Sequence, residues 1–68
     1  MSMVGDQIRK ERKRRGLSQE ELAQKAHLHR TYVSLLERNR RKPTTDVFER
    51  ICDALNLKPS TVFRRMGK

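Results

Sequence analysis

The segment from Ser18 to Asn39 constrains the fold of this chain most, because two short helical patterns follow each other across a gap of only three residues. Ser18 precedes Glu21 by three positions, the spacing of a capping box that opens a helix. Two apolar groups then recur at helical spacing, first Leu22, Ala23 and Ala26, then Tyr32, Val33 and Leu36. A helix from Gln19 to about Ala26 must therefore bend sharply into a second helix of about Arg30 to Arg38.

The second of these helices carries a mixed polar and apolar outer face. At about 100° per residue, the side opposite its apolar stripe presents Arg30, Thr31, Ser34, Leu35 and Arg38. A face that is merely solvated favours Glu and Lys over residues such as Thr31 and Leu35. Guanidinium, hydroxyl and methyl groups are what read base edges and thymine methyls in the major groove of DNA. We therefore predict a recognition helix whose base-reading residues are Arg30, Thr31, Ser34 and Leu35.

Two basic clusters flank this predicted recognition helix. The 68 residues carry a net charge of +9, so an acidic polymer is the natural partner. Six of the seven residues from Arg9 to Arg15 are basic, as are four of the five from Arg38 to Lys42. The first cluster has two open interpretations, a solvated helix face or a set of phosphate contacts. The second follows the recognition helix, where a loop approaches the DNA backbone directly, and predicts phosphate contacts from Arg38, Arg41 and Lys42.

At these residues the chain resembles the Cro and phage-repressor type of helix-turn-helix regulator, the xenobiotic-response-element family. The strings SQEELAQKA, HRTYVSLLERN and RKPT carry the resemblance, which covers about Ile8 to Phe63. Within the family, RTYVSLLERNRR is similar to the controller proteins of restriction-modification systems. The resemblance implies an all-α, compact five-helix lambda-repressor-like domain with its helix-turn-helix at about 18–38. It also implies a homodimer that binds near-palindromic double-stranded DNA operators and controls transcription, with RNA polymerase as a further expected partner.

The resemblance implies roles for residues outside the base-reading face as well. Gln19, at the start of the first motif helix, takes a phosphate or base position, and we expect Tyr32 to contact phosphate too. Arg12 shares a helix face with Ile8, and its family counterpart forms a structural ion pair with the equivalent of Glu37. The chain departs from the usual family pattern in having His27 for the turn Gly, His29 for a small capping residue and Asn39 for the Gly after the recognition helix.

The apolar content of 34% predicts a small core shared among the helices. The expected members are Ile8, Leu17, Leu22, Ala23, Ala26, Leu28, Val33, Leu36, Val47, Ile51, Leu55 and Leu57. Cys52 is expected to be a small buried hydrophobe. We predict that Gly16 ends the first helix as a left-handed cap, that Thr44 opens the fourth helix and that Asn56 ends it.

The C-terminal residues predict a fifth, dimerising helix at about 59–66. Pro59 sits at the first helical position, and the residues from Ser60 to Met66 continue the helix with Val62, Phe63 and Met66 on one side. This apolar patch either packs on the core or joins the same patch of a second copy. We expect both, with Val62 partly in the core and Phe63 or Met66 at the dimer contact.

Other functions find little support in the sequence. His27 and His29, one residue apart, do not complete a metal site with the single Cys52, so no metal is expected. The chain has no Gly-rich phosphate loop and no nucleophile motif, and we expect no catalytic residue, no cofactor and no small-molecule ligand. It has no signal peptide and no apolar run that would cross a membrane, which favours one cytoplasmic domain over residues 1–68. The alternatives that stay open are an antitoxin-type protein-interaction module, a nonspecific nucleic-acid-binding protein and a basic peptide that binds anionic membranes.

Overall fold

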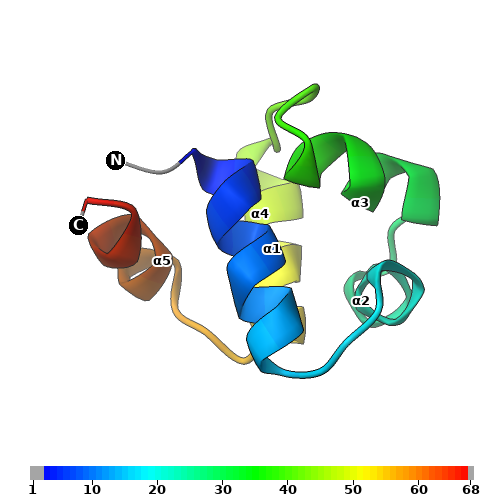
Figure 1. Ribbon diagram of the computed structural model, residues 1–68, viewed down its shortest axis with the longest axis horizontal. Helices are drawn as coiled ribbons and strands as arrows, with labels where there is room; N and C mark the ends of the chain where they lie inside the picture. Colours follow the sequence, from blue (N-terminus) through cyan, green and yellow to red (C-terminus); the bar gives the residue numbers. More distant parts are fainter. Residues whose placement is uncertain (1–2, 68) are drawn as a thin grey trace.

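The fold, in a computed structural model that describes residues 3–67, consists of five α-helices (Figure 1). They are α1 (Val4–Arg14), α2 (Gln19–Ala26), α3 (Arg30–Glu37), α4 (Thr45–Ala54) and α5 (Pro59–Met66). No strand occurs within this part of the chain. The predicted all-α, five-helix architecture is confirmed, and α2 and α3 have the bounds expected of the two motif helices, except that Arg38 caps α3 instead of belonging to it.

The helices pack in an order that separates the two candidate surfaces of the molecule. α2 contacts α3 and α4, whereas α1 contacts α3 and α5, and α4 also contacts α5. In Figure 1, α1 and α4 overlap at the centre, α2 and α3 lie to the right of them, and α5 lies to the left. The pair α2 and α3 and the helix α5 therefore occupy opposite flanks of the molecule.

The core consists of two clusters that meet along α4. The main cluster contains nine of the twelve predicted core residues, namely Ile8, Leu22, Ala23, Ala26, Val33, Leu36, Val47, Ile51 and Leu55. The second lies under α5 and contains Phe48, Cys52 and Val62. Cys52 is buried as expected, but Phe48 was not predicted. α4 has two apolar stripes because it packs against α2 on one side and α5 on the other.

Val62 is buried more deeply than the sequence predicts, which corrects its place at the dimer contact. It is only 2% exposed and belongs to the cluster under α5, so it is part of the chain's own core and is not available to contact a second copy. Phe63, the next residue, is 59% exposed, and Met66 is half-buried. The apolar side of α5 is therefore divided, with Val62 turned inward and Phe63 left at the surface.

Four helices end in the same way, with a residue in the left-handed conformation. These residues are Gly16 (φ 69°), His27 (φ 57°), Asn39 (φ 60°) and Asn56 (φ 57°). The residue after each one donates its backbone N–H to a carbonyl five positions earlier, at 2.8 to 3.1 Å, which defines a Schellman motif. The predicted ends at Gly16 and Asn56 are thus confirmed, and the sharp turn at His27 is the same motif.

The Schellman motif also corrects three predicted core residues. Leu17, Leu28 and Leu57 are half-buried and pack against the edge of the core instead of lying inside it. Each directly follows a left-handed residue, where the motif brings an apolar side chain back onto the last turn of the helix. These leucines cover the last turns of α1, α2 and α4 at the edge of the core.

The helices start where the capping residues and Pro59 predict. Ser18 Oγ accepts a hydrogen bond from Glu21 N at 3.0 Å while Ser18 N donates to Glu21 Oε1 at 2.9 Å, which is the predicted capping box. Thr44 Oγ1 accepts from Val47 N at 3.2 Å at the start of α4. Pro59 is the first residue of α5. Within residues 3–67, no helix has the length and apolar character needed to cross a membrane.

Candidate nucleic-acid interface

The turn between α2 and α3 is fastened from α4 by Arg50. Arg50 Nε donates to the carbonyl of Ala26 at 3.1 Å, and Arg50 Nη2 donates to the carbonyl of His27. Both carbonyls belong to the end of α2, where backbone oxygens lack partners within the helix. Arg50 therefore fixes the angle between the two helices. Sequence patterns gave no signal for this contact, because the partners are 23 and 24 residues apart and the acceptors are backbone atoms.

The start of α3 is capped by His29 in place of a small polar residue. His29 Nδ1 accepts a hydrogen bond from Thr31 N at 3.2 Å, so the imidazole does what a Ser or Asp side chain does at an N-cap. An Nδ1 that accepts carries no proton. The departure from the family pattern at this position is therefore compatible with a regular start of the helix.

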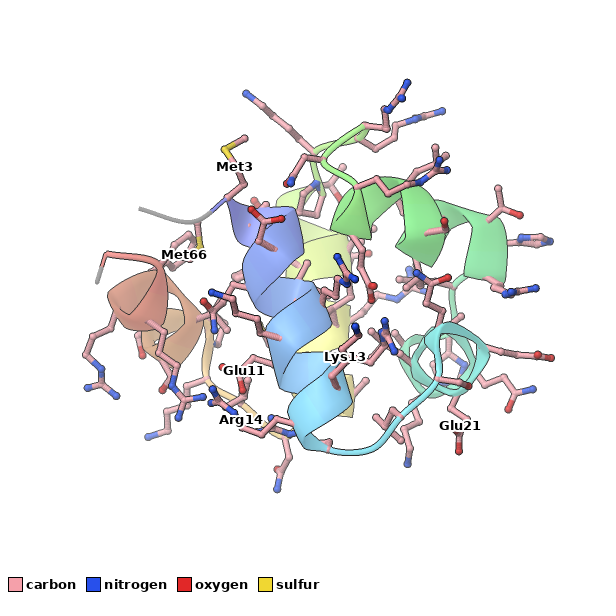
Figure 2. All side chains as sticks on the ribbon, viewed as in Figure 1. Met3, Glu11, Lys13, Arg14, Glu21 and Met66 are labelled. Atoms are coloured by element: carbon pink, nitrogen blue, oxygen red, sulfur yellow. The ribbon has the colours of Figure 1, made fainter. Side chains whose placement is uncertain are left out.

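The four predicted base-reading residues all lie on α3, but the structure exposes them unequally. Arg30 and Thr31 are exposed in its first turn, whereas Ser34 and Leu35 are half-buried one turn later. Side chains at this edge of the molecule extend outward from α3 (Figure 2). The backbone N–H groups of Thr31 and Tyr32 already donate to His29, so the exposed side chains form the contact surface of this turn. The exposed first turn of α3 is the part best placed to enter a groove.

The predicted phosphate-contacting residues fall into two groups. Arg38, Arg41 and Lys42 are exposed on the segment that links α3 to α4. Gln19 is half-buried, and its Nε2 donates to Glu37 Oε1 at 3.2 Å. Tyr32 is half-buried and packs against the main core cluster. Within the first group Arg38 Nε donates to the carbonyl of Ser34 at 3.4 Å, a contact at the surface, whereas Gln19 and Tyr32 are engaged by buried parts of the protein.

Behind the recognition helix, Arg12 and Glu37 form a buried ion pair. Arg12 Nε and Nη2 donate to the two carboxylate oxygens of Glu37 at 2.7 and 3.0 Å, and Arg12 Nη1 donates to the carbonyl of Leu17 at 2.8 Å. The side chains are 10% and 1% exposed. The pair joins α1, the segment before α2 and the end of α3, which is the structural role expected of it.

Glu11, a residue that sequence reasoning missed, pairs with Arg14 and Arg15 of the basic cluster from Arg9 to Arg15. Its side chain is fully buried and accepts hydrogen bonds from Arg65, Arg15, Gln7 and Arg14 at 2.6, 2.9, 2.8 and 3.4 Å. Figure 2 shows Glu11 on the side of α1 that faces α5. The available signal was that Glu11 is the one acidic residue in a basic run.

Two opposing effects set the charge state of Glu11. Burial raises the pKa of its carboxyl, but hydrogen bonds from Arg65, Arg15 and Gln7 and the nearby charge of Arg14 lower it, and the net pKa lies below the usual value. Glu11 therefore stays ionised. It ties α5 to α1 and commits part of the first basic cluster to the fold, which leaves the exposed residues Arg9, Lys10 and Lys13 of that cluster.

A sharp turn fastened at both helix ends, an exposed first turn on α3 and a basic loop beside it define a helix-turn-helix protein. Residues 8–62 match the helix-turn-helix family. The chain belongs to this family of DNA-binding regulators. Within the family, it is similar to controller proteins of restriction-modification systems.

Three relatives give the extent of this similarity. The immunity repressor protein of Bacillus phage phi105 is 39% identical over 59 residues, which cover 87% of this chain and 41% of that protein. The control protein C.BamHI of Bacillus amyloliquefaciens is 40% identical over 58 residues, which cover 84% of this chain and 72% of that protein. The restriction-modification controller protein C.Esp1396I, solved as a tetramer with its natural 35 base-pair operator, has a TM-score of 0.86 and 38% identity over 93% of this chain and 83% of its own. The chain thus spans about two fifths of the phage repressor's length.

Proposed function

We propose that this protein is a homodimeric, sequence-specific regulator of transcription that places α3 in the major groove of double-stranded operator DNA. The exposed first turn of α3, with Arg30 and Thr31 at its surface beside a basic loop, carries the proposal. The operator complex of C.Esp1396I supports it. The favoured subtype is a controller of restriction-modification genes, in line with the similarity to C.BamHI.

The side chains have separate tasks in this proposal. Base edges are read by Arg30, Thr31, Ser34 and Leu35, with Arg30 addressing guanine O6 and N7. Phosphates are contacted by Gln19, Tyr32, Arg38, Arg41 and Lys42. Gln19 can keep its bond to Glu37 while it does so, because its amide nitrogen carries two N–H donors and this bond uses one of them.

The homodimer contact is proposed at the groove beside α5. Met3 and Phe63 are the exposed large hydrophobic residues of the described chain, at 55% and 59%, and both line one open groove of ≈ 740 Å³ together with Phe48 and Met66. Met3 and Met66 lie at the end of the molecule where the start of α1 meets α5 (Figure 2). A second copy that covers the Met3 and Phe63 side of this groove buries apolar surface on both chains at once, and leaves the opposite side, lined by Arg41 and Lys42, open to DNA.

The remaining expectations complete the proposal. The chain acts as one domain over residues 1–68 in the cytoplasm, without an enzymatic activity, a cofactor, a metal ion or a small-molecule ligand. RNA polymerase is the proposed partner when the dimer is bound beside a promoter.

Selection of random duplex DNA tests this function. The purified protein is mixed with a random duplex pool near physiological salt and excess nonspecific competitor, and the bound pool is sequenced. We expect an enriched inverted repeat with half-sites about one helical turn apart. A folded protein that enriches no sequence rejects the regulator and favours nonspecific nucleic-acid binding or a protein partner.

Two single variants then separate base reading from phosphate contact. Arg30→Ala is expected to cost about 1 to 3 kcal/mol at one base position and to relax the preference there. Arg41→Ala is expected to weaken operator and random DNA alike and to reduce the salt dependence by about one phosphate contact. Binding isotherms at several salt concentrations measure both. Equal losses on operator and random DNA for Arg30→Ala would reject its assigned task.

A further inference from the structure

The end of α3 differs from the other Schellman ends of this fold. After the left-handed residues of α1, α2 and α4 comes a leucine that packs against the core, whereas Asn39 at the end of α3 is followed by exposed Arg40. The apolar contact that closes such a motif is therefore missing at the point where the chain enters the basic loop Arg38–Lys42.

The side chain of Asn39 supplies polar contacts to α1 at this end. Asn39 Oδ1 accepts a hydrogen bond from Gly5 N at 3.1 Å, and Asn39 Nδ2 donates to Asp6 Oδ1 at 3.2 Å. Met3, the N-cap residue of α1, makes no side-chain capping bond, so the first turn of α1 is capped by a residue 34 positions away. Asn39 thus joins the loop after α3 to the start of α1.

Gly5 makes this close approach possible. A Cβ at Gly5 would lie 2.1 Å from the backbone oxygen of Leu36 and 2.5 Å from Asn39 Oδ1. Only a residue without a side chain lets the first turn of α1 rest on the last turn of α3. The backbone of Asn39, at φ 60°, would suit glycine equally well, but glycine would form neither side-chain bond.

We propose that Asn39 is a positioning residue for DNA binding, which holds the basic loop Arg38–Lys42 against α1 so that its side chains meet phosphates without a prior ordering step. The proposal rests on the proposed DNA-binding function. A loop that occupies its binding-competent arrangement only part of the time binds more weakly by that fraction. Phosphate contacts carry no sequence information. The contact of Asn39 with α1, called the clamp below, therefore governs affinity for all duplexes and leaves sequence choice to α3.

The test compares Asn39→Gly with Asn56→Gly, a matched control. Asn56 holds the same Schellman position with the same backbone conformation, but at the far end of α4 from the loop. Both variants replace a left-handed Asn by the residue best suited to that conformation, so both are expected to stay folded, as circular dichroism and thermal unfolding will check. Only Asn39→Gly removes the bonds to Gly5 and Asp6.

Binding to a random duplex, and to the selected operator, is measured by titration at several salt concentrations. Asn39→Gly is expected to weaken both by the same factor, about fivefold, and to leave the slope of log K against log salt unchanged, because the loop makes the same phosphate contacts once it is bound. Asn56→Gly is expected to bind like the parent.

Equal binding by the Asn39→Gly and Asn56→Gly variants would overturn the proposal, as would a loss confined to the operator. A loss of affinity that simply tracks a fall in the folded fraction would overturn it too, because a purely structural contact predicts that result. A parent protein that prefers no sequence would reject the regulator, yet the clamp would still be read from the affinity for random duplex.

Discussion

Arg12 shows how one side chain holds the recognition helix from behind. Its guanidinium meets both oxygens of Glu37 and the carbonyl of Leu17, and the pair is almost excluded from solvent. A buried pair of this kind adds little net stability, but loss of one partner leaves the other charge buried and unmatched. The contact therefore sets where α3 lies relative to α1 more than it sets the stability of the fold.

Arg12→Lys is expected to lower the free energy of unfolding by about 2 kcal/mol or more, although the charge is kept. An ammonium group cannot match the forked geometry, and the carbonyl of Leu17 loses its donor. Urea denaturation followed by circular dichroism measures the change, with the exposed Arg9→Lys as the control expected within about 0.5 kcal/mol of the parent. Equal effects of the two substitutions on the free energy of unfolding would contradict a requirement for the forked guanidinium group at position 12.

Cys52 gives the protein a distinctive response to alkaline pH. Burial raises the pKa of its thiol from 9.0 to about 11, with smaller contributions from Asp53 and Glu49. Between these values the unfolded chain has released the thiol proton and the folded chain still holds it, so stability falls as pH rises. Two pKa units correspond to about 2 to 3 kcal/mol. We expect the free energy of unfolding to fall by that amount between pH 9 and 11 relative to Cys52→Ala, measured by denaturant titration at each pH. Parallel curves for the two proteins would contradict it.

At the scale of helices, local chemistry made the starts and ends predictable. The capping box at Ser18, the left-handed Gly16 and Asn56, and Pro59 at the start of α5 each depend on residues close in sequence. The contacts that sequence reasoning missed join residues far apart. Glu11 meets Arg65 across 54 positions, and Phe48 is buried in a cluster with Val62 of α5, against which Val4 of α1 packs.

The candidate site was predictable to a similar degree. The outer face of α3 follows from helical periodicity, so Arg30 and Thr31 are exposed where the pattern placed them. Periodicity does not report which polar groups the protein uses internally, and for that reason the bonds of Gln19 to Glu37 and of Arg50 to the turn were invisible in the sequence. Burial of Val62 in the chain's own core depends on tertiary packing in the same way.

His27→Gly is expected to stabilise the turn between α2 and α3. His27 is exposed and adopts φ 57°, a conformation that costs a residue with a Cβ about 1 kcal/mol or more and costs glycine nothing. The greater freedom of glycine in the unfolded chain offsets part of the gain, which leaves about 0.5 kcal/mol. Thermal unfolding measures the shift. His27→Ala, which keeps the Cβ, serves as the control and is expected to give no gain; a less stable glycine variant would contradict the argument.

At the scale of the whole molecule, the two flanks suit a dimer on DNA. α3 lies on one side of α1 and α4, and α5 lies on the other (Figure 1). The longest extent of the chain is 28 Å. A two-fold axis beside α5 would place the two copies of α3 on opposite outer flanks of the dimer, and binding to successive major grooves requires them to lie about 34 Å apart. Arg65 and its bond to Glu11 hold α5 against α1, beside the proposed dimer contact.

Phe63→Ala is expected to weaken the dimer more than the fold. Phe63 is 59% exposed, so most of its surface faces solvent. Its ring also contacts that of Phe48, with the two centroids 5.2 Å apart. Full burial of a Phe side chain is worth about 1.5 to 3 kcal/mol, so covering the exposed part on both chains is worth about 2 to 3 kcal/mol, which predicts a dimer dissociation constant about 30- to 150-fold higher. Sedimentation velocity over a range of protein concentrations measures this constant.

The same substitution should affect a full operator and a single half-site differently. A half-site duplex needs only one copy of α3, so the affinity of Phe63→Ala for it should match that of the parent, while binding to the full inverted repeat should need more protein. Ser60→Ala, an exposed substitution on the same helix that changes no charge, is the control. Unchanged sedimentation of the Phe63→Ala variant would show that the dimer contact does not involve α5. A parent protein that stays monomeric at all concentrations would show that two copies associate only on the operator.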